Sequence, residues 1–289
     1  MQNKKKDIIL GTALWGWGIE KKMAFKILDN FVENNYLTID VATNYPISGN
    51  EHQYGQSIDW LREWKNFNQE IKLNIICKIG SIENNKTPTC RLNKSFLYLS
   101  KEIILQKLQD SLSCIMVHWD NRSDKKDICE TIEFFEDAYN EGFEIGLSGI
   151  KYPEIYFENS KKLVDKWIIQ IKENILNNKM RKYYQEYFPN CHYQAYGINL
   201  GGIKLSNTEV SISTKVRGIN IPNSIKEEIM CIFEKNSINP MPNSIYDFLL
   251  GSIYLRDDIS SLIISPSNTT QLSKSIGYIR KIEKNNNYF

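Results

Sequence analysis

Four polar side chains stand at or near the ends of short apolar runs, where they could take part in proton and charge transfer. Asp40 ends one run, Tyr45 follows it five residues later, Lys78 ends the next run and His118 ends a third. Tyrosine is a weak acid with an unperturbed pKa of about 10. An adjacent ammonium is expected to lower that pKa toward working pH. Asp40 would then hold Lys78 in its charged form, and His118 would orient a substrate oxygen.

These side chains meet only if the runs that carry them are neighbouring parallel strands. Short apolar runs alternate with segments whose apolar residues recur at helical spacing. The expected strands cover residues 7–13, 36–40, 73–78, 114–118, 143–148, 167–171, 191–196 and 261–265. The clearest expected helices cover residues 23–32, 103–112, 128–139 and 245–255.

Eight such units in 289 residues favour an α/β fold with a closed (β/α)8 TIM barrel, as a single domain over residues 1–289. The first run is not followed by Gly-x-Gly-x-x-Gly, which argues against an open dinucleotide-binding sheet. The polar segments 81–95 and 197–223 would then emerge at the C-terminal mouth of the barrel, where active sites are built.

Each of the four polar residues has an ordinary structural explanation when it is taken alone. An aspartate at a strand end commonly caps a turn, a lysine there is commonly solvated, and a histidine in an apolar run is commonly a hydrogen-bonded core residue. Their placement at three consecutive strand ends favours a shared site instead.

Composition and charge narrow the classes of function. The 36 basic and 34 acidic residues nearly cancel, which argues against a nucleic-acid partner. No run approaches 18 apolar residues, so we expect no membrane association. The six cysteines are scattered, without metal-binding or disulfide-framework spacing. We therefore expect a reduced, cytoplasmic protein with no metal site.

Residues 39–45, Ile-Asp-Val-Ala-Thr-Asn-Tyr, resemble the signature of the aldo-keto reductases. The similarity extends through nearly the whole chain, from Leu-Gly-Thr-Ala-Leu-Trp at 10–15 to Ile-Ile-Ser-Pro-Ser-Asn at 263–268. It implies a catalytic tetrad of Asp40, Tyr45, Lys78 and His118. It also implies an NAD(P)H-dependent oxidoreductase that reduces an aldehyde, ketone or sugar carbonyl to an alcohol, or catalyses the reverse reaction.

The resemblance implies further contacts around that tetrad. Cofactor contacts are expected from nine residues: Gly11, Thr12, Ser148, Gln170, Tyr196, Ser265, Ser267, Asn268 and Gln271. Aromatic residues at a barrel mouth commonly wall a substrate pocket, so Trp15 and Trp119 are expected to contact the substrate.

Two departures from the family pattern concern the cofactor. Gly149 replaces the asparagine expected after Ser148, which removes one contact to the nicotinamide amide. The segment 265–275 lacks the usual Lys/Arg pair for the 2′-phosphate and keeps only Lys274, although Lys204, Lys215 and Arg217 lie in the loop after the seventh strand. We therefore expect NADP(H) as the cofactor, with a small preference over NAD(H).

Two other functions stay open at this point. A cofactor-binding regulatory protein could keep the barrel while turning over little, and a lyase could use Lys78 as a Schiff base. The partner expected from the leading interpretation is a small-molecule carbonyl substrate, either a free or a nucleotide-linked sugar or a simpler carbonyl.

Overall fold

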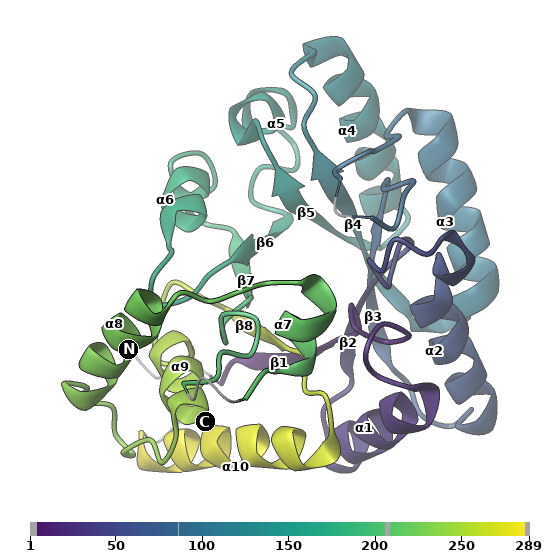
Figure 1. The fold of residues 1–289 in the computed structure, drawn as a ribbon. Coiled ribbons are helices and arrows are strands. Elements are labelled where there is room, and N and C mark those ends of the chain that lie inside the picture. The colour runs from purple at the N-terminus through teal and green to yellow at the C-terminus, as the bar shows by residue number, and fades with distance from the viewer. Residues whose placement is uncertain (1–4, 86, 206–208, 287–289) are drawn as a thin grey trace.

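The computed structural model of the chain describes residues 5–85, 87–205 and 209–286. Eight parallel strands close into a barrel in chain order (Figure 1). The strands are β1 (Asp7–Gly11), β2 (Thr38–Ala42), β3 (Asn74–Ile79), β4 (Leu112–Asp120), β5 (Glu144–Ile150), β6 (Trp167–Lys172), β7 (His192–Tyr196) and β8 (Ser261–Ile264). The expectation of a (β/α)8 barrel is confirmed, whereas the single-domain assignment stays a prediction.

Helices surround the barrel and alternate with its strands (Figure 1). They are α1 (Lys21–Glu33), α2 (Gln56–Phe67), α3 (Lys94–Leu108), α4 (Lys125–Asn140), α5 (Pro153–Asn159), α6 (Lys179–Gln185), α7 (Ile212–Arg217), α8 (Asn223–Glu234), α9 (Ile245–Tyr254) and α10 (Thr269–Asn285). Two short 3₁₀ turns are η1 (Glu51–Gln53) and η2 (Gln109–Ser111).

The helix expected over residues 103–112 was placed wrongly at both ends. The structure begins α3 at Lys94 and ends it at Leu108. Gln109 has a φ of 50°, a left-handed value that an α-helix cannot continue through. The apolar residues that follow therefore belong to β4, which starts at Leu112.

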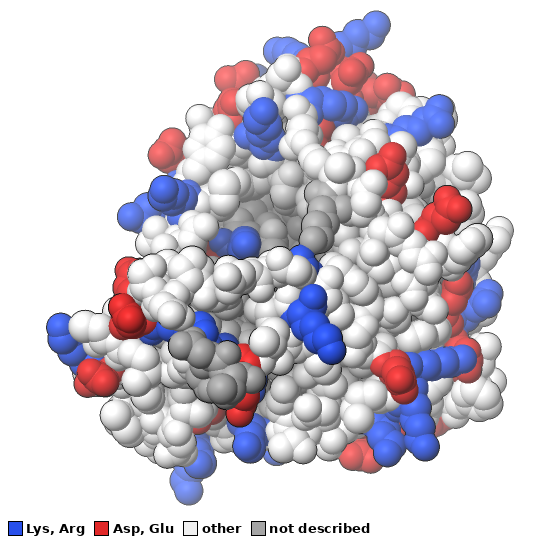
Figure 2. All heavy atoms as spheres, viewed as in Figure 1, with Lys and Arg blue, Asp and Glu red and all other residues white. Residues whose placement is uncertain are grey.

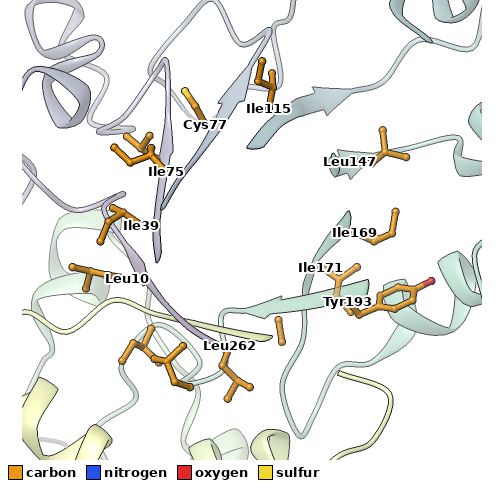
Figure 3. Close-up of a cluster of buried hydrophobic side chains, with 14 of the residues drawn as sticks. Leu10, Ile39, Ile75, Cys77, Ile115, Leu147, Ile169, Ile171, Tyr193 and Leu262 are labelled. Atoms are coloured by element: carbon orange, nitrogen blue, oxygen red, sulfur yellow. The ribbon is translucent and has the colours of Figure 1, made fainter. Parts of the chain in front are cut away.

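Alternation along the strands separates two kinds of surface. Side chains that point out of the barrel, such as Leu10, Ile39, Ile115 and Leu147, join the main hydrophobic core, and Figure 3 shows them around the ring of strands. Because side chains alternate with a period of two, the residues between them point inward. This alternation gives the barrel an outer core that the helices cover.

The inward side chains form an apolar floor with a polar layer above it. The floor contains Ile9, Ile76, Cys114, Met116 and Ile263. Lys78 and His118 come two residues after Ile76 and Met116 on the same strands. The inward polar residues are Asp40, Lys78, His118, Ser148, Gln170 and Gln194, all buried. A polar layer of this kind is costly unless its members are paired, so its bonds decide what the barrel mouth can do.

Helix α7, which follows β7 in the chain, packs on the loop after β1 (Figure 1). The contact is closest at Gly18, whose φ is 102° and where a Cβ would lie 2.6 Å from Ile212 Cγ2. Figure 2 shows that this face of the molecule is hollowed beside α7. Among the described residues, none of the helices has the length and apolar character needed to cross a membrane.

Candidate active site

The four residues expected to act together do lie together in the polar layer. Lys78 Nζ contacts both carboxylate oxygens of Asp40, Oδ2 at 2.5 Å, and lies 4.9 Å from the centroid of the Tyr45 ring. The Tyr45 ring meets the His118 ring edge-on, with centroids 5.7 Å apart. None of the four residues exposes more than 8% of its surface. The site therefore joins an ion pair, a phenol and an imidazole in a volume shielded from solvent.

Backbone hydrogen bonds between β1, β2 and the following turn set this geometry. The backbone oxygen of Asp40 accepts hydrogen bonds from both the amide and the hydroxyl of Thr12, at 3.2 and 2.9 Å. Tyr45 lies in the turn after β2, where its amide donates to Ala42 O at 3.1 Å. Lys78 is the register partner of Ala42, which places its ammonium beside that turn.

The protonation states favour a charged lysine and a protonated tyrosine. Burial works against the charge of Lys78, but Asp40 and Tyr45 outweigh it and raise the Lys78 pKa above its ordinary value. Burial also raises the pKa of the Tyr45 phenol, and the Lys78 charge opposes this effect without overcoming it. The expected lowering of the Tyr45 pKa is therefore only a partial effect, because desolvation of the phenolate is the larger cause.

His118 is a neutral imidazole in this environment. Burial, and then the positive charge of Lys78, hold the pKa of His118 well below its ordinary range. Its Nδ1 is buried without a hydrogen-bond partner among the described residues. Ser81 Oγ donates to the His118 backbone oxygen at 3.0 Å, which ties β4 at this residue to the loop after β3. A neutral ring can donate one hydrogen bond to a substrate oxygen and accept another.

A second group of polar side chains continues around the barrel on β5, β6 and β7. His118, Ser148, Gln170 and Gln194 are register partners on successive strands, so they form one row across the sheet. Ser148 Oγ donates to Gln170 Oε1 at 3.4 Å, and Gln170 Nε2 donates to Asp40 Oδ2 at 2.7 Å. The row is therefore bonded across the barrel to the ion pair.

This row has the chemistry that a nicotinamide needs. A hydroxyl and an amide suit the donor and acceptor atoms of a carboxamide. Tyr196 ends β7 half-buried on the same inward face as Gln194, and its ring could stack on the nicotinamide. The donor set of Ser148, Gln170 and Tyr196 thus fits the cofactor implied by the sequence.

The absence of a side chain at position 149 has a steric explanation in this structure. Its φ is 72°, and a Cβ there would lie 2.5 Å from Trp119 Cδ1. Trp119 itself has a φ of 62°, and its ring packs on the His118 ring with centroids 4.3 Å apart. A left-handed backbone is unusual for a bulky residue and is commonly found at functional sites. The indole therefore occupies the space that an asparagine at position 149 would need.

The start of α10 lies where the far end of the cofactor is expected. A Cβ on Gly11 would lie 2.5 Å from Ser265 Oγ, so β1 and the end of β8 are in close contact. Asn268 Oδ1 caps the helix by accepting from the Gln271 amide at 2.9 Å. Gln271 Oε1 in turn accepts from the amide and hydroxyl of Ser267, both at 2.9 Å. These side chains build a pre-formed helix N-terminus without a cation in its first turn.

The three basic residues of the loop after β7 differ in their surroundings. Lys204 pairs with Glu209 at 3.3 Å, and its ammonium also lies 5.6 Å from the centroid of the Tyr246 ring. The Arg217 guanidinium lies 5.7 Å from the centroid of the Trp17 ring, which places it on the β1 side of the mouth. Lys215 is exposed. Lys204 is thus already paired with an acidic neighbour.

Two of the expected ligand contacts are deeply buried in the structure. Trp15 is 1% exposed and belongs to the main hydrophobic core. The Thr12 hydroxyl already donates a hydrogen bond to the Asp40 backbone oxygen. Trp119 is half-buried beside His118, as a pocket wall requires. Gln194 was not singled out as a site residue. The period-two spacing from Gln194 to Tyr196 was the available signal, because both must point inward.

Comparison with known proteins places this geometry in a wider group. A family model described as the aldo/keto reductase family matches residues 7–286. The glycerol dehydrogenase AKR11B4 from Gluconobacter oxydans has a similar structure, with a TM-score of 0.68 and 15% identity over 96% of this chain and 91% of that chain. At this identity the likeness shows the common fold. No curated protein matches the sequence.

Proposed function

Because this chain belongs to the aldo/keto reductase family, we propose that it reduces the carbonyl group of a small molecule with NADPH and can catalyse the reverse oxidation. The family relationship supports NAD(P)-dependent carbonyl oxidoreduction in general. The observation that carries the proposal is the contact of Lys78 with both Asp40 and Tyr45, beside the edge-on ring of His118.

Each residue of the tetrad has a distinct task in this proposal. A bound reduced nicotinamide supplies the hydride. The Tyr45 phenol donates the proton to the carbonyl oxygen, since burial keeps it protonated and the nearby Lys78 charge stabilises the phenolate left behind. Asp40 holds Lys78 in place, and neutral His118 orients the substrate oxygen by a hydrogen bond.

The cofactor would bind along the β5–β8 side of the mouth. Ser148 and Gln170 would hold the carboxamide, and Tyr196 would stack on the ring. Ser265, Ser267, Asn268 and Gln271 would meet the adenosine end, together with Gly11, where the close approach of β1 and β8 leaves no room for a side chain. Thr12 would support this site through the Asp40 backbone.

The substrate would enter from the hollowed face beside α7 (Figure 2). Trp119 would form one wall beside His118, and Trp17 is a stronger candidate for the opposite wall than the buried Trp15. Free and nucleotide-linked sugars and simpler carbonyls all stay open as substrates. A cytoplasmic location also stays a prediction.

The charge state of Lys78 disfavours the lyase alternative. A Schiff base forms through the neutral amine, whereas Asp40 and Tyr45 raise the Lys78 pKa. The regulatory alternative keeps the fold and the cofactor but predicts little turnover. A variant of the proton donor separates it from the proposed enzyme.

Tyr45→Phe tests the proposal directly. We expect kcat for reduction of a carbonyl panel to fall by about 10²–10⁴-fold, since general acid catalysis contributes that much. NADPH affinity, measured by fluorescence quenching, should stay within about twofold, because the ring is kept. If the parent protein binds NADPH but turns over no carbonyl, the regulatory alternative holds. If the variant keeps most of its kcat, Tyr45 is not the acid.

A further inference from the structure

Gln194 is a buried polar residue to which the proposed chemistry assigns no task. It points into the barrel from β7, is 5% exposed and is the register partner of Gln170 on β6. Burying an amide costs free energy unless it is hydrogen-bonded. The bonds that Gln194 makes therefore indicate what it contributes to the site.

Gln194 completes the hydrogen bonding of one end of Gln170. Gln170 Nε2 donates to Gln194 Oε1 at 3.0 Å and to Asp40 Oδ2 at 2.7 Å. An amide nitrogen carries two hydrogens, so both are used within the protein. The other end, Gln170 Oε1, accepts one hydrogen bond, from Ser148 Oγ at 3.4 Å, and an amide oxygen can accept two. Only the oxygen of Gln170 has capacity left for a ligand.

The two acceptors also determine which way the Gln170 amide faces. In the reversed orientation its oxygen would face the Asp40 carboxylate, and its nitrogen would face Ser148. Asp40 alone would anchor one hydrogen and leave the amide free to tilt about that bond. Gln194 anchors the second hydrogen from the neighbouring strand, which fixes the plane of the amide.

We propose that Gln194 is a positioning residue that holds Gln170 with its oxygen toward the cofactor, as the acceptor for an N–H of the nicotinamide carboxamide. This inference rests on the proposed function. Gln170 would contribute more to binding of the carboxamide here than in a site with an asparagine at position 149, because Trp119 excludes that asparagine side chain. Gln194 itself does not touch the reacting atoms.

The test compares two cofactors that differ in the proposed hydrogen bond. The 3-acetylpyridine analogue of the reduced cofactor replaces the carboxamide NH2 with a methyl group. In the wild-type protein, fluorescence quenching should show about tenfold weaker binding of the analogue, as one hydrogen bond predicts. In Gln194→Met the ratio should fall below about threefold, because Gln170 can turn away from the ligand.

Gln194→Glu is the matched control. It keeps an acceptor oxygen at the same chain length. Burial and the nearby Asp40 carboxylate favour its protonated form, whose carbonyl oxygen still accepts from Gln170 Nε2, so it should restore the roughly tenfold ratio. If Gln194→Met does not fold, Gln194→Asn provides the same comparison, because its shorter amide cannot reach Gln170. A purely structural role would weaken both cofactors equally and leave the ratio unchanged.

The outcomes separate this inference from the proposed function. If the wild-type protein binds neither cofactor, the proposed function fails. If the wild-type protein binds both but does not discriminate, or Gln194→Met discriminates as well as wild type, the role of Gln194 is overturned while the proposed reductase stands.

Discussion

The buried ion pair between Lys78 and Asp40 makes a prediction that can be measured without any ligand. Their side chains are 2% and 5% exposed, so water screens neither charge. Lys78→Met removes the cation, keeps a side chain of similar length and leaves the Asp40 carboxylate buried. Breaking a buried pair in this way typically destabilises a protein by about 3–5 kcal/mol.

We expect the lower part of that range here. Asp40 would keep its hydrogen bond from Gln170 Nε2 at 2.7 Å, which compensates part of the lost interaction. A loss of about 3 kcal/mol, with a urea slope of about 3 kcal/mol per molar, moves the unfolding midpoint down by about 1 M. Equilibrium urea unfolding at neutral pH, followed by circular dichroism, measures this change.

The double variant Asp40→Asn/Lys78→Met is the control. It removes both charges, so it should be more stable than Lys78→Met by about 2 kcal/mol, because no unpaired carboxylate stays buried. The reasoning is refuted if Lys78→Met costs less than about 1 kcal/mol, or if the double variant is no more stable than the single one.

Three further predictions concern pH, packing and cofactor choice. Burial lowers the pKa of His118, so the unfolded state binds more protons than the folded state and stability should fall as pH drops below about 6.5. Urea unfolding between about pH 7 and 5 measures this slope, and His118→Gln should flatten it. Gly149→Asn should destabilise the protein by about 1–3 kcal/mol, because the new side chain would contact Trp119. The same substitution in a Trp119→Ala background should cost less, and an equal cost in both backgrounds would contradict the steric explanation. NADPH should bind about tenfold more tightly than NADH if one cation meets the 2′-phosphate, and Lys274→Ala should bring the ratio of the two affinities near one in parallel titrations. A preference for NADPH above roughly a thousandfold would mean that the cations that bind the 2′-phosphate lie elsewhere.

Most of the barrel could be predicted from the sequence because its signals are local. Each strand is a short apolar run, and successive helices have apolar residues at helical spacing, so strand number and order follow from periodicity. The convergence of Asp40, Lys78 and His118 followed from one geometric rule, that parallel strands present their carboxyl ends at the same mouth. The end of α3 was missed because Leu108 and Leu112 keep the helical spacing of apolar residues, although the backbone turns at Gln109 between them.

The remaining features depend on contacts between strands that are distant in the sequence. Periodicity shows that Gln194 points inward, but only the closed barrel places it beside Gln170 and, through that amide, next to Asp40, 154 positions earlier in the chain. The direction of the Tyr45 pKa shift was misjudged because a sequence shows the neighbouring charge but not the burial that opposes it. Gly149 looked like a lost contact, and the folded chain shows an indole in its place. The sequence thus determined which strands form and which residue types meet at the mouth, whereas desolvation and steric exclusion between strands, which exist only in the folded barrel, decided how those residues are bonded.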